Sequence, residues 1–159
     1  MDMNIVSDWP MDRWFSRGAV MPKISIAEFD HLLETEMPWA LEAGLALDSL
    51  GKGQAVMRLP FRDSMLRPGG TVSGPTMMML ADANMYAVVL SAIGVVRLAV
   101  TTSFNINFLQ RPSPADLIAE GRALKIGRRL AVVEVNVHSD GHDDPVAHAT
   151  GTYSIPPDR

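Results

Sequence analysis

The stretch RPGGTVSGPTMMMLADANMYAVVLSAIG, residues 67–94, decides the fold of this chain. It opens with a glycine-rich turn and continues as a long apolar run between Pro75 and Gly94. Proline is favoured at the start of a helix and glycine just past its end, so these two residues predict one helix. The run has no polar face, and a helix that is apolar all round is buried in a core or in a bilayer.

Asp82 is the only charged residue between Arg67 and Arg97. An ionised carboxylate is costly in apolar surroundings, and burial raises the pKa of such a group. Asp82 is therefore either a general base or nucleophile in a dry pocket, or a structural carboxylate that neighbouring hydroxyl or amide groups satisfy. Burial by itself does not separate these two interpretations.

The predicted helix has nearly the length of a membrane span, which needs about 20 residues. Asp82 and Asn84 near its middle would be costly in a bilayer, and the rest of the sequence is rich in strand patterns. We therefore predict a core helix and no membrane association.

The composition is that of one globular domain, with 159 residues, 47% of them apolar and 20% charged. A net charge of -4 gives no basic field and argues against nucleic-acid binding. The absence of cysteine excludes disulfides, thiolate zinc sites and cysteine nucleophiles, and it fits a reducing compartment. The N-terminus carries aspartates with no apolar run between them, which argues against a signal peptide, so we expect a cytoplasmic protein.

The chain divides into a short N-terminal segment and one domain. Residues 1–24 show no regular pattern, but Trp9, Trp14 and Phe15 are too apolar for a free tail. We expect this segment to pack on the body of the protein or on a neighbouring subunit. Residues 25–159 form the single predicted domain.

The strand pattern predicts one antiparallel sheet. A first helix begins at the capping box of Ser25 and Glu28, and Pro38 should end or kink it. Close turns join the strands that follow, which is typical of antiparallel pairs. The predicted strands are Leu45–Ser49, Gln54–Leu59, 98–110, Asp116–Ile126, Arg129–Ser139 and Pro145–Ile155, with a loop from Pro60 to Gly70. Such a sheet wrapped around the apolar helix is an α+β fold.

The first strand after the central helix alternates with period two, which assigns its side chains to two faces. One face holds Val100, Thr102, Phe104, Ile106 and Phe108. The other holds Ala99, Thr101, Ser103, Asn105 and Asn107, of which the asparagines indicate a hydrogen-bonded interface. The hydroxyls of Thr101 and Ser103 on this face are candidates for placing a carboxylate or a water, although ordinary sheet positions explain them as well.

The glycine-rich turn places backbone N–H groups at the start of the central helix. These groups are unpaired and lie at the positive end of the helix dipole, where they bind anions or polarise a carbonyl. Pro75 has no N–H, so Gly74 is the natural donor at this edge. A tight turn without any ligand explains the same pattern, and neither a phosphate loop nor a dinucleotide-binding glycine motif is present.

Gly74 and Asp82 are eight residues apart, which is about 12 Å along one helix. One small reacting group cannot contact both within a single chain. If the two residues act together, one of them must come from a second subunit, which predicts a homo-oligomer with a two-fold interface through the helices.

Lys125, Arg128 and Arg129 form a basic cluster around the predicted turn at Gly127. Such a cluster binds the phosphates of a ligand, or it is the solvated end of a hairpin. The four histidines show no metal-ligand spacing, so we predict no metal site. No serine lies in a nucleophile-elbow motif, which argues against a serine hydrolase of that type.

Three stretches carry a resemblance to a known family: GGTVSGPTMMMLADANMYA, AVTTSFNINFL, and GRRLAVVEVNVHSD followed by PVAHATGTYSI. In these stretches, and over about residues 44–155, the chain resembles hotdog-fold proteins and more specifically the PaaI-type acyl-CoA thioesterases. The resemblance implies hydrolysis of acyl-CoA thioesters by a dimer or a dimer of dimers.

The resemblance also implies roles for single residues. In that family a glycine amide polarises the thioester carbonyl, an aspartate from another subunit activates water or attacks the carbonyl, and a Ser or Thr places the water. These positions hold Gly74, Asp82 and Thr101. Coenzyme A is then part of the substrate, with no other cofactor required, and the basic cluster lies near its phosphates. The methionines at 77 to 79 line an acyl pocket or simply fill the core.

Two positions depart from the family pattern. Ser73 stands where the family has a histidine before the glycine, and Arg67 stands where a polar residue, often asparagine, precedes that histidine by six residues. Serine hydrogen-bonds but does not carry the proton load of histidine. Ser73 therefore supports an alternative, a non-catalytic acyl-CoA binding module, whereas the retained Asp82 favours an enzyme. A hydratase or dehydratase, which works with a histidine, ranks last.

Overall fold

The computed structural model describes residues 20–157 of the chain. The aromatic residues that we expect to anchor the N-terminal segment lie outside this range. The division of the chain at residue 25 therefore stays a prediction.

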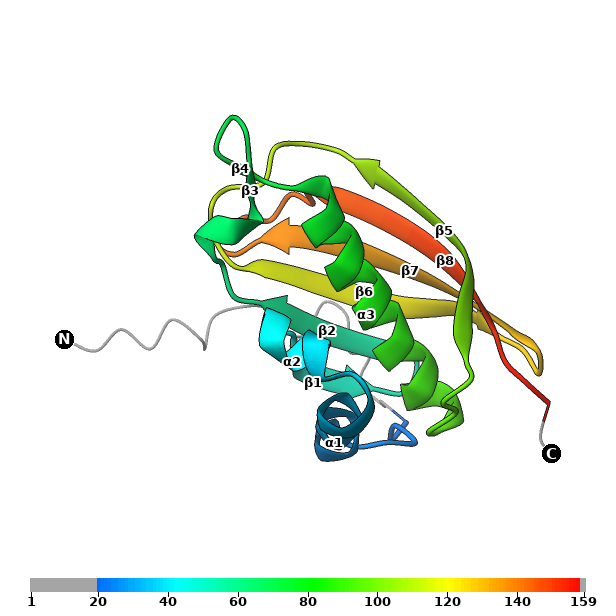
Figure 1. The fold of residues 1–159 in the computed structure, drawn as a ribbon. Helices are drawn as coiled ribbons and strands as arrows, with labels where there is room; N and C mark the ends of the chain where they lie inside the picture. The colour runs from blue at the N-terminus through cyan, green and yellow to red at the C-terminus, as the bar shows by residue number, and fades with distance from the viewer. Residues whose placement is uncertain (1–19, 158–159) are drawn as a thin grey trace.

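Six antiparallel strands form one sheet in the order β1, β2, β6, β7, β8, β5 (Figure 1). They are β1 (Ala46–Gly51), β2 (Gln54–Leu59), β5 (Val100–Phe108), β6 (Leu117–Ile126), β7 (Leu130–Ser139) and β8 (Ala147–Ser154). One long helix, α3 (Gly74–Ile93), lies across one face of the sheet and contacts every strand in it. The predicted α+β architecture is confirmed, and each predicted strand ends within two residues of the observed one.

Two shorter helices, α1 (Ile26–Glu36) and α2 (Pro38–Ala43), precede the sheet and lie near β1 (Figure 1). The capping box is present, because the Ser25 hydroxyl accepts from Glu28 N–H and the Glu28 carboxylate accepts from Ser25 N–H. Pro38 ends the first helix and begins the second, as its lack of an N–H predicts.

Helix α3 begins at Gly74, one residue before the predicted start, and Pro75 is its second residue. It ends at Gly94, whose φ of +94° lies in the region that favours glycine. Within residues 20–157, α3 is the one helix with the length and hydropathy of a membrane span, and 67% of that window is buried inside the protein. The sheet encloses it, so the predicted core helix is confirmed.

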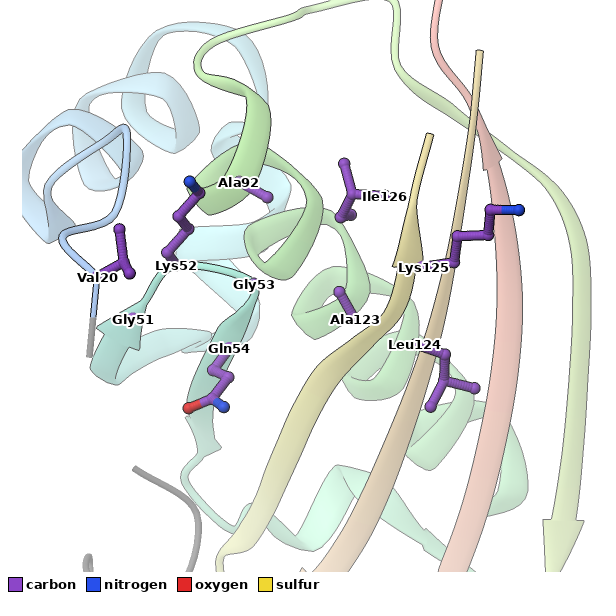
Figure 2. Close-up of a pocket in the computed structure, with 10 residues that line it drawn as sticks. All are labelled: Val20, Gly51, Lys52, Gly53, Gln54, Ala92, Ala123, Leu124, Lys125 and Ile126. Atoms are coloured by element: carbon purple, nitrogen blue, oxygen red, sulfur yellow. The ribbon is translucent and has the colours of Figure 1, made fainter. Parts of the chain in front are cut away.

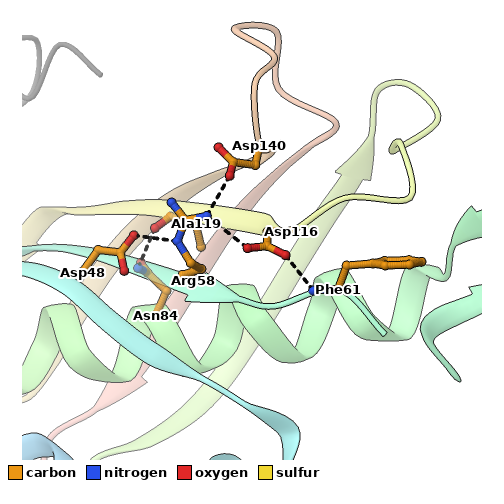
Figure 3. A network of polar contacts seen from close by, with 7 residues as sticks. All are labelled: Asp48, Arg58, Phe61, Asn84, Asp116, Ala119 and Asp140. Atoms are coloured by element: carbon orange, nitrogen blue, oxygen red, sulfur yellow. Dashed lines mark hydrogen bonds and ion pairs between the residues drawn. The ribbon is translucent and has the colours of Figure 1, made fainter. Parts of the chain in front are cut away.

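A buried asparagine joins α3 to the middle of the sheet. The Asn84 side chain is fully buried, and its Nδ2 donates to the carbonyl of Ala55 on β2 at 3.0 Å. It also donates to the carbonyl of Ala119 on β6 at 3.0 Å (Figure 3). A Cβ at Gly121 of β6 would overlap Asn84 Oδ1, so this glycine permits the helix to approach the sheet. Asn84 is thus a structural residue.

An arginine with three carboxylates ties the ends of several strands together (Figure 3). Arg58 on β2 donates to Asp48 on β1 at 3.1 Å, to Asp116 before β6 at 3.3 Å and to Asp140 after β7 at 2.9 Å. Asp116 in turn accepts from the Phe61 N–H at 2.8 Å. Because these groups satisfy one another at the edge of the sheet, we read the cluster as structural.

The predicted loop before α3 contains a small hairpin. Strands β3 (Leu66–Arg67) and β4 (Thr71–Val72) pair with each other, and positive φ angles at Gly69 and Gly70 form the turn. Two-residue strands are too short to show an alternating pattern, so the sequence prediction of a plain loop was wrong here.

Strand β5 contains a bulge that corrects the predicted faces. Thr101 pairs with Tyr153 of β8 and Ser103 pairs with the preceding residue, so Thr102 is an extra residue in the ladder. A bulge of this kind reverses the alternation of side chains. Thr101 therefore faces α3 together with Phe104, and it does not share a face with Ser103 as the period-two pattern predicted.

Candidate active site

Asp82 lies in the first half of α3, half-buried, on the flank that borders β8 and β5. Its Oδ1 accepts two hydrogen bonds, from Thr101 Oγ1 at 2.7 Å and from the Tyr153 hydroxyl at 3.1 Å. The Tyr153 hydroxyl also lies 3.1 Å from the main-chain carbonyl of Asp82, so its single proton is shared between the two oxygens. Asp82 Oδ2 has no hydrogen-bond partner among residues 20–157. One carboxylate oxygen is thus held, while the other is available.

The sheet register brings the two hydroxyls to the same carboxylate. Thr101 and Tyr153 are direct partners across β5 and β8, and the bulge turns Thr101 toward α3. The structure therefore unites two of the predicted site residues, Asp82 and Thr101. It also adds Tyr153, which the sequence prediction missed. The available signal was a tyrosine among the small inward residues of β8, since a buried tyrosine hydroxyl needs a partner.

Tyr153 remains a hydrogen-bond donor at every physiological pH. It is only 2% exposed, and burial, with the nearby charge of Asp82, raises the pKa of its hydroxyl far above the ordinary value. Its ring stacks on that of Tyr86, with centroids 6.4 Å apart, and Phe29 of α1 packs against Tyr86 at 6.2 Å. Burial also raises the pKa of Tyr86. The tyrosine beside Asp82 is therefore neutral and tightly packed.

Gly74 is the first residue of α3, and its N–H has no acceptor among residues 20–157. Ser73 does not cap the helix, because its hydroxyl pairs instead with Thr76 Oγ1 at 2.8 Å. A Cβ at Gly74 would lie 3.2 Å from the ring of Phe108, so a larger residue would press on that ring. The start of α3 therefore offers an unused donor at the positive end of the helix.

Within one subunit, the structure does not bring Gly74 and Asp82 together. Both lie on α3, eight residues apart, which corresponds to about 12 Å of helix. One small reacting group therefore cannot contact both residues within a single folded subunit.

The basic residues lie at two places. Arg67 is exposed on the β3–β4 hairpin, which precedes the start of α3. Lys125, Arg128 and Arg129 are exposed at the β6–β7 turn. Lys125 also lines an open pocket of about 700 Å³ beside Ala92, near the other end of α3. Lys52 lines the same pocket, but the two lysines point in different directions (Figure 2).

Of the three methionines that follow the helix start, only two are accessible. Met77 is 3% exposed and belongs to the core, whereas Met78 is 41% exposed and Met79 is half-buried. Met77 is therefore a core residue. Among residues 20–157 there is no group of three or more His, Asp or Glu side chains arranged to hold a metal ion.

Comparison with known proteins identifies the family. The family model described as "Thioesterase superfamily" matches residues 69–146. A Saccharolobus solfataricus protein named "Putative esterase SSO1253" is 29% identical over 137 residues, which cover 86% of this chain and 89% of that protein.

Solved structures agree with this family. A Silicibacter sp. TM1040 protein described as a "putative thioesterase" is 43% identical, with a TM-score of 0.75 over 87% of this chain and 94% of that one. A mutant of the phenylacetic acid degradation protein PaaI from Thermus thermophilus is 28% identical, with a TM-score of 0.67 over 75% and 99% of the two chains. The chain therefore belongs to the thioesterase superfamily, as a hotdog-fold hydrolase of thioesters or esters.

Proposed function

We propose that this protein hydrolyses acyl-CoA thioesters to the free acid and coenzyme A. In this proposal the Gly74 N–H of one subunit binds the thioester carbonyl oxygen, and Asp82 of the partner subunit is the general base or the nucleophile. The observation that carries the proposal is the state of Asp82: hydroxyls hold Oδ1, and Oδ2 accepts from no residue in the described range 20–157.

The chemistry needs two functions, and the chain supplies a candidate for each. The Gly74 N–H at the start of α3, which has no acceptor among residues 20–157, suits the negative charge that develops on the carbonyl oxygen. Asp82 either takes a proton from water, which then attacks the carbonyl carbon, or attacks that carbon directly. In both routes the C–S bond breaks, the coenzyme A sulfur leaves with a proton, and water supplies the new oxygen of the acid.

The edge of the sheet supports a homo-oligomer. Strand β5 pairs with β8 on one side and, within residues 20–157, with no strand on the other. Large apolar side chains near the two ends of this edge are exposed, with Val100 at 51% and Phe108 at 50%. An unpaired nine-residue edge with exposed apolar groups is suited to association with a second copy. A dimer or a dimer of dimers would also let two copies of α3 approach each other.

Substrate contacts follow from the accessible residues. Met78 and Met79 lie one turn before Asp82 and are candidates to contact the acyl group. The basic cluster Lys125, Arg128 and Arg129, together with Arg67, supplies candidate partners for the coenzyme A phosphates.

The direct test is thiol release from a panel of acyl-CoA esters by the native chain and by Asp82→Asn. Asn keeps the size of the side chain but cannot act as a base, so we expect kcat to fall by about 100-fold or more. Asp63→Asn, at an exposed aspartate outside α3, is the matched control and should keep full activity. Turnover that survives Asp82→Asn unchanged would refute the catalytic role.

A mixing experiment tests the shared site. Asp82→Asn and Gly74→Val should each be inactive alone, since the second fills the space beside Phe108 and obstructs the amide. If each site combines two subunits, co-refolding equal amounts rebuilds one native site per mixed dimer and returns about a quarter of the native activity. A site within one chain would return none.

The competing function is a binding module without catalysis, which Ser73 in place of the family histidine favours. It predicts tight acyl-CoA binding by both the native chain and Asp82→Asn, with thiol release from neither. The same panel therefore separates the two functions.

A further inference from the structure

We propose that Tyr153 is a positioning residue for Asp82: together with Thr101 it fixes the carboxylate so that Oδ2 is the oxygen that reacts. The inference rests on the proposed function, because it assigns a role within that reaction. The sequence prediction of the site contained Asp82 and Thr101 but not Tyr153.

The hydrogen bonds divide the carboxylate into a held oxygen and a free oxygen. Oδ1 accepts from Thr101 Oγ1 at 2.7 Å and from the Tyr153 hydroxyl at 3.1 Å. Two donors occupy the acceptor directions of Oδ1, whereas Oδ2 accepts from no residue in 20–157. The torsion of the carboxylate is thereby fixed, and Oδ2 is the only oxygen left to take a proton or to attack a carbon.

Tyr153 also fixes the helix that carries Asp82. The same hydroxyl lies 3.1 Å from the Asp82 main-chain carbonyl, so one side chain restrains both the backbone and the carboxylate of this residue. Of these two groups of Asp82, Thr101 hydrogen-bonds only the carboxylate. Tyr153 therefore sets where Asp82 lies, and Thr101 helps to set how its carboxylate is turned.

Tyr153 is itself held rigidly. It lies on β8, an inner strand between β7 and β5, and its ring stacks on Tyr86. Catalytic groups must be held to within a fraction of an ångström, and misplacement by about 1 Å can cost 100-fold in rate. A rigid, neutral hydroxyl on an inner strand meets that requirement.

The test compares Tyr153→Phe with Tyr86→Phe. Each variant loses one tyrosine hydroxyl and keeps its ring, but only the first loses a bond to Asp82. We expect Tyr153→Phe to lower kcat for acyl-CoA hydrolysis by about 10-fold or more while KM changes by less than about twofold. Tyr86→Phe should keep both constants. Equal kcat values in the two variants would overturn the inference.

Two variants of Thr101 provide a second test of the same inference. Thr101→Ser keeps the hydroxyl and should keep most of kcat, whereas Thr101→Val removes it at nearly constant volume. Either remaining donor still restrains Oδ1, so the combined variant Tyr153→Phe with Thr101→Val should lose more than the product of the two single losses. A purely structural role would instead lower thermal stability without this coupling in kcat.

A crystallographic readout keeps the inference independent of turnover. The Asp82 carboxylate should keep its orientation in Tyr86→Phe and turn away from it in the combined variant. An unchanged carboxylate in the combined variant would refute positioning even if no substrate is found. Failure of the proposed function looks different: the native chain releases no thiol, whereas failure of positioning leaves an enzyme that needs Asp82 but not the Tyr153 hydroxyl.

Discussion

The two sides of α3 use polar residues in opposite ways. Toward the sheet, Asn84 is fully buried and gives both amide protons to backbone carbonyls. On the flank toward β8 and β5, Asp82 is half-buried, with one oxygen bound by side-chain hydroxyls and the other without a partner in the described part of the chain. Only Ala83 lies between Asn84, which is bound to the sheet, and Asp82, which has an oxygen that can accept a further hydrogen bond. The difference teaches that burial alone does not mark a reactive group: the oxygen of Asn84 also lacks a hydrogen-bond partner within residues 20–157 but is sealed in the core, whereas Asp82, the residue that we propose to react, is only half-buried.

The largest expected effect is on the sheet side, at Gly121. A Cβ there would overlap Asn84 Oδ1 and lie 2.9 Å from a Val88 methyl carbon, so Gly121→Ala should lower the free energy of unfolding by about 3 kcal/mol. Because Asn84 is the main obstacle, the same change in an Asn84→Ala background should cost about 1 kcal/mol. Urea unfolding at fixed protein concentration measures both. Equal costs in the two backgrounds would show that the contact with Asn84 does not limit the approach of the helix.

Measuring both stability and activity for variants of Asn84 and of Asp82 sharpens the comparison. Asn84→Ala should lower the free energy of unfolding by about 2 kcal/mol, because two hydrogen bonds are lost in a buried site, and should leave kcat nearly unchanged. Asp82→Asn should change stability by less than about 1 kcal/mol while removing activity. Urea titrations and thiol-release assays on both variants test this. The comparison fails if Asp82→Asn is the less stable of the two.

A smaller effect on stability is expected at Ser91, near the C-terminal end of α3. The Ser91 hydroxyl accepts from the Gly53 N–H at 2.8 Å and donates to the Val88 carbonyl at 2.7 Å. Ser91→Ala leaves that N–H without its acceptor and should cost about 1 kcal/mol of unfolding free energy, which urea titration measures. Ser64→Ala, at an exposed serine, is the control and should cost nothing measurable.

The smallest effect on stability is expected on the accessible flank. Met78 is 41% exposed, so Met78→Ala should change the free energy of unfolding by less than about 0.5 kcal/mol. If Met78 contacts the acyl group, the order of kcat/KM values across the acyl-CoA panel should change. Met77→Ala, at the 3% exposed neighbour, should instead cost about 2 kcal/mol and leave that order intact. Thermal melts and the panel together distinguish the two.

Local signals explain what the sequence could predict. Pro75 and Gly94 bracket α3 because both act through their own backbone chemistry, and the capping box at Ser25 is equally local. The inner strands were predicted to within two residues because turns and alternation are also local. Asp82 and Thr101 were singled out from the sequence pattern, and a family resemblance implied their joint role; both residues lie in one hydrogen-bonded cluster.

Features that depend on pairing between distant segments could not be predicted. The bulge at Thr102 is a property of the β5–β8 register, and it decides which threonine faces α3. Tyr153 joins the site only through that register. The sequence also could not predict which residues of α3 face the core. A helix that is apolar all round gives no sign that Met77 is buried and Met78 is exposed.

The two consecutive threonines at the bulge, Thr101 and Thr102, determine how β5 would tolerate the deletion of a residue. Thr102 is the extra residue of the ladder, and its neighbour Thr101 faces Asp82. Loss of either threonine would restore a regular ladder to the unchanged residues from Ser103 onward, and the surviving threonine would occupy the position that faces Asp82. This part of β5 can therefore lose one residue, in evolution or in design, and still present a threonine hydroxyl to the carboxylate, whereas deletion of both threonines removes that hydroxyl.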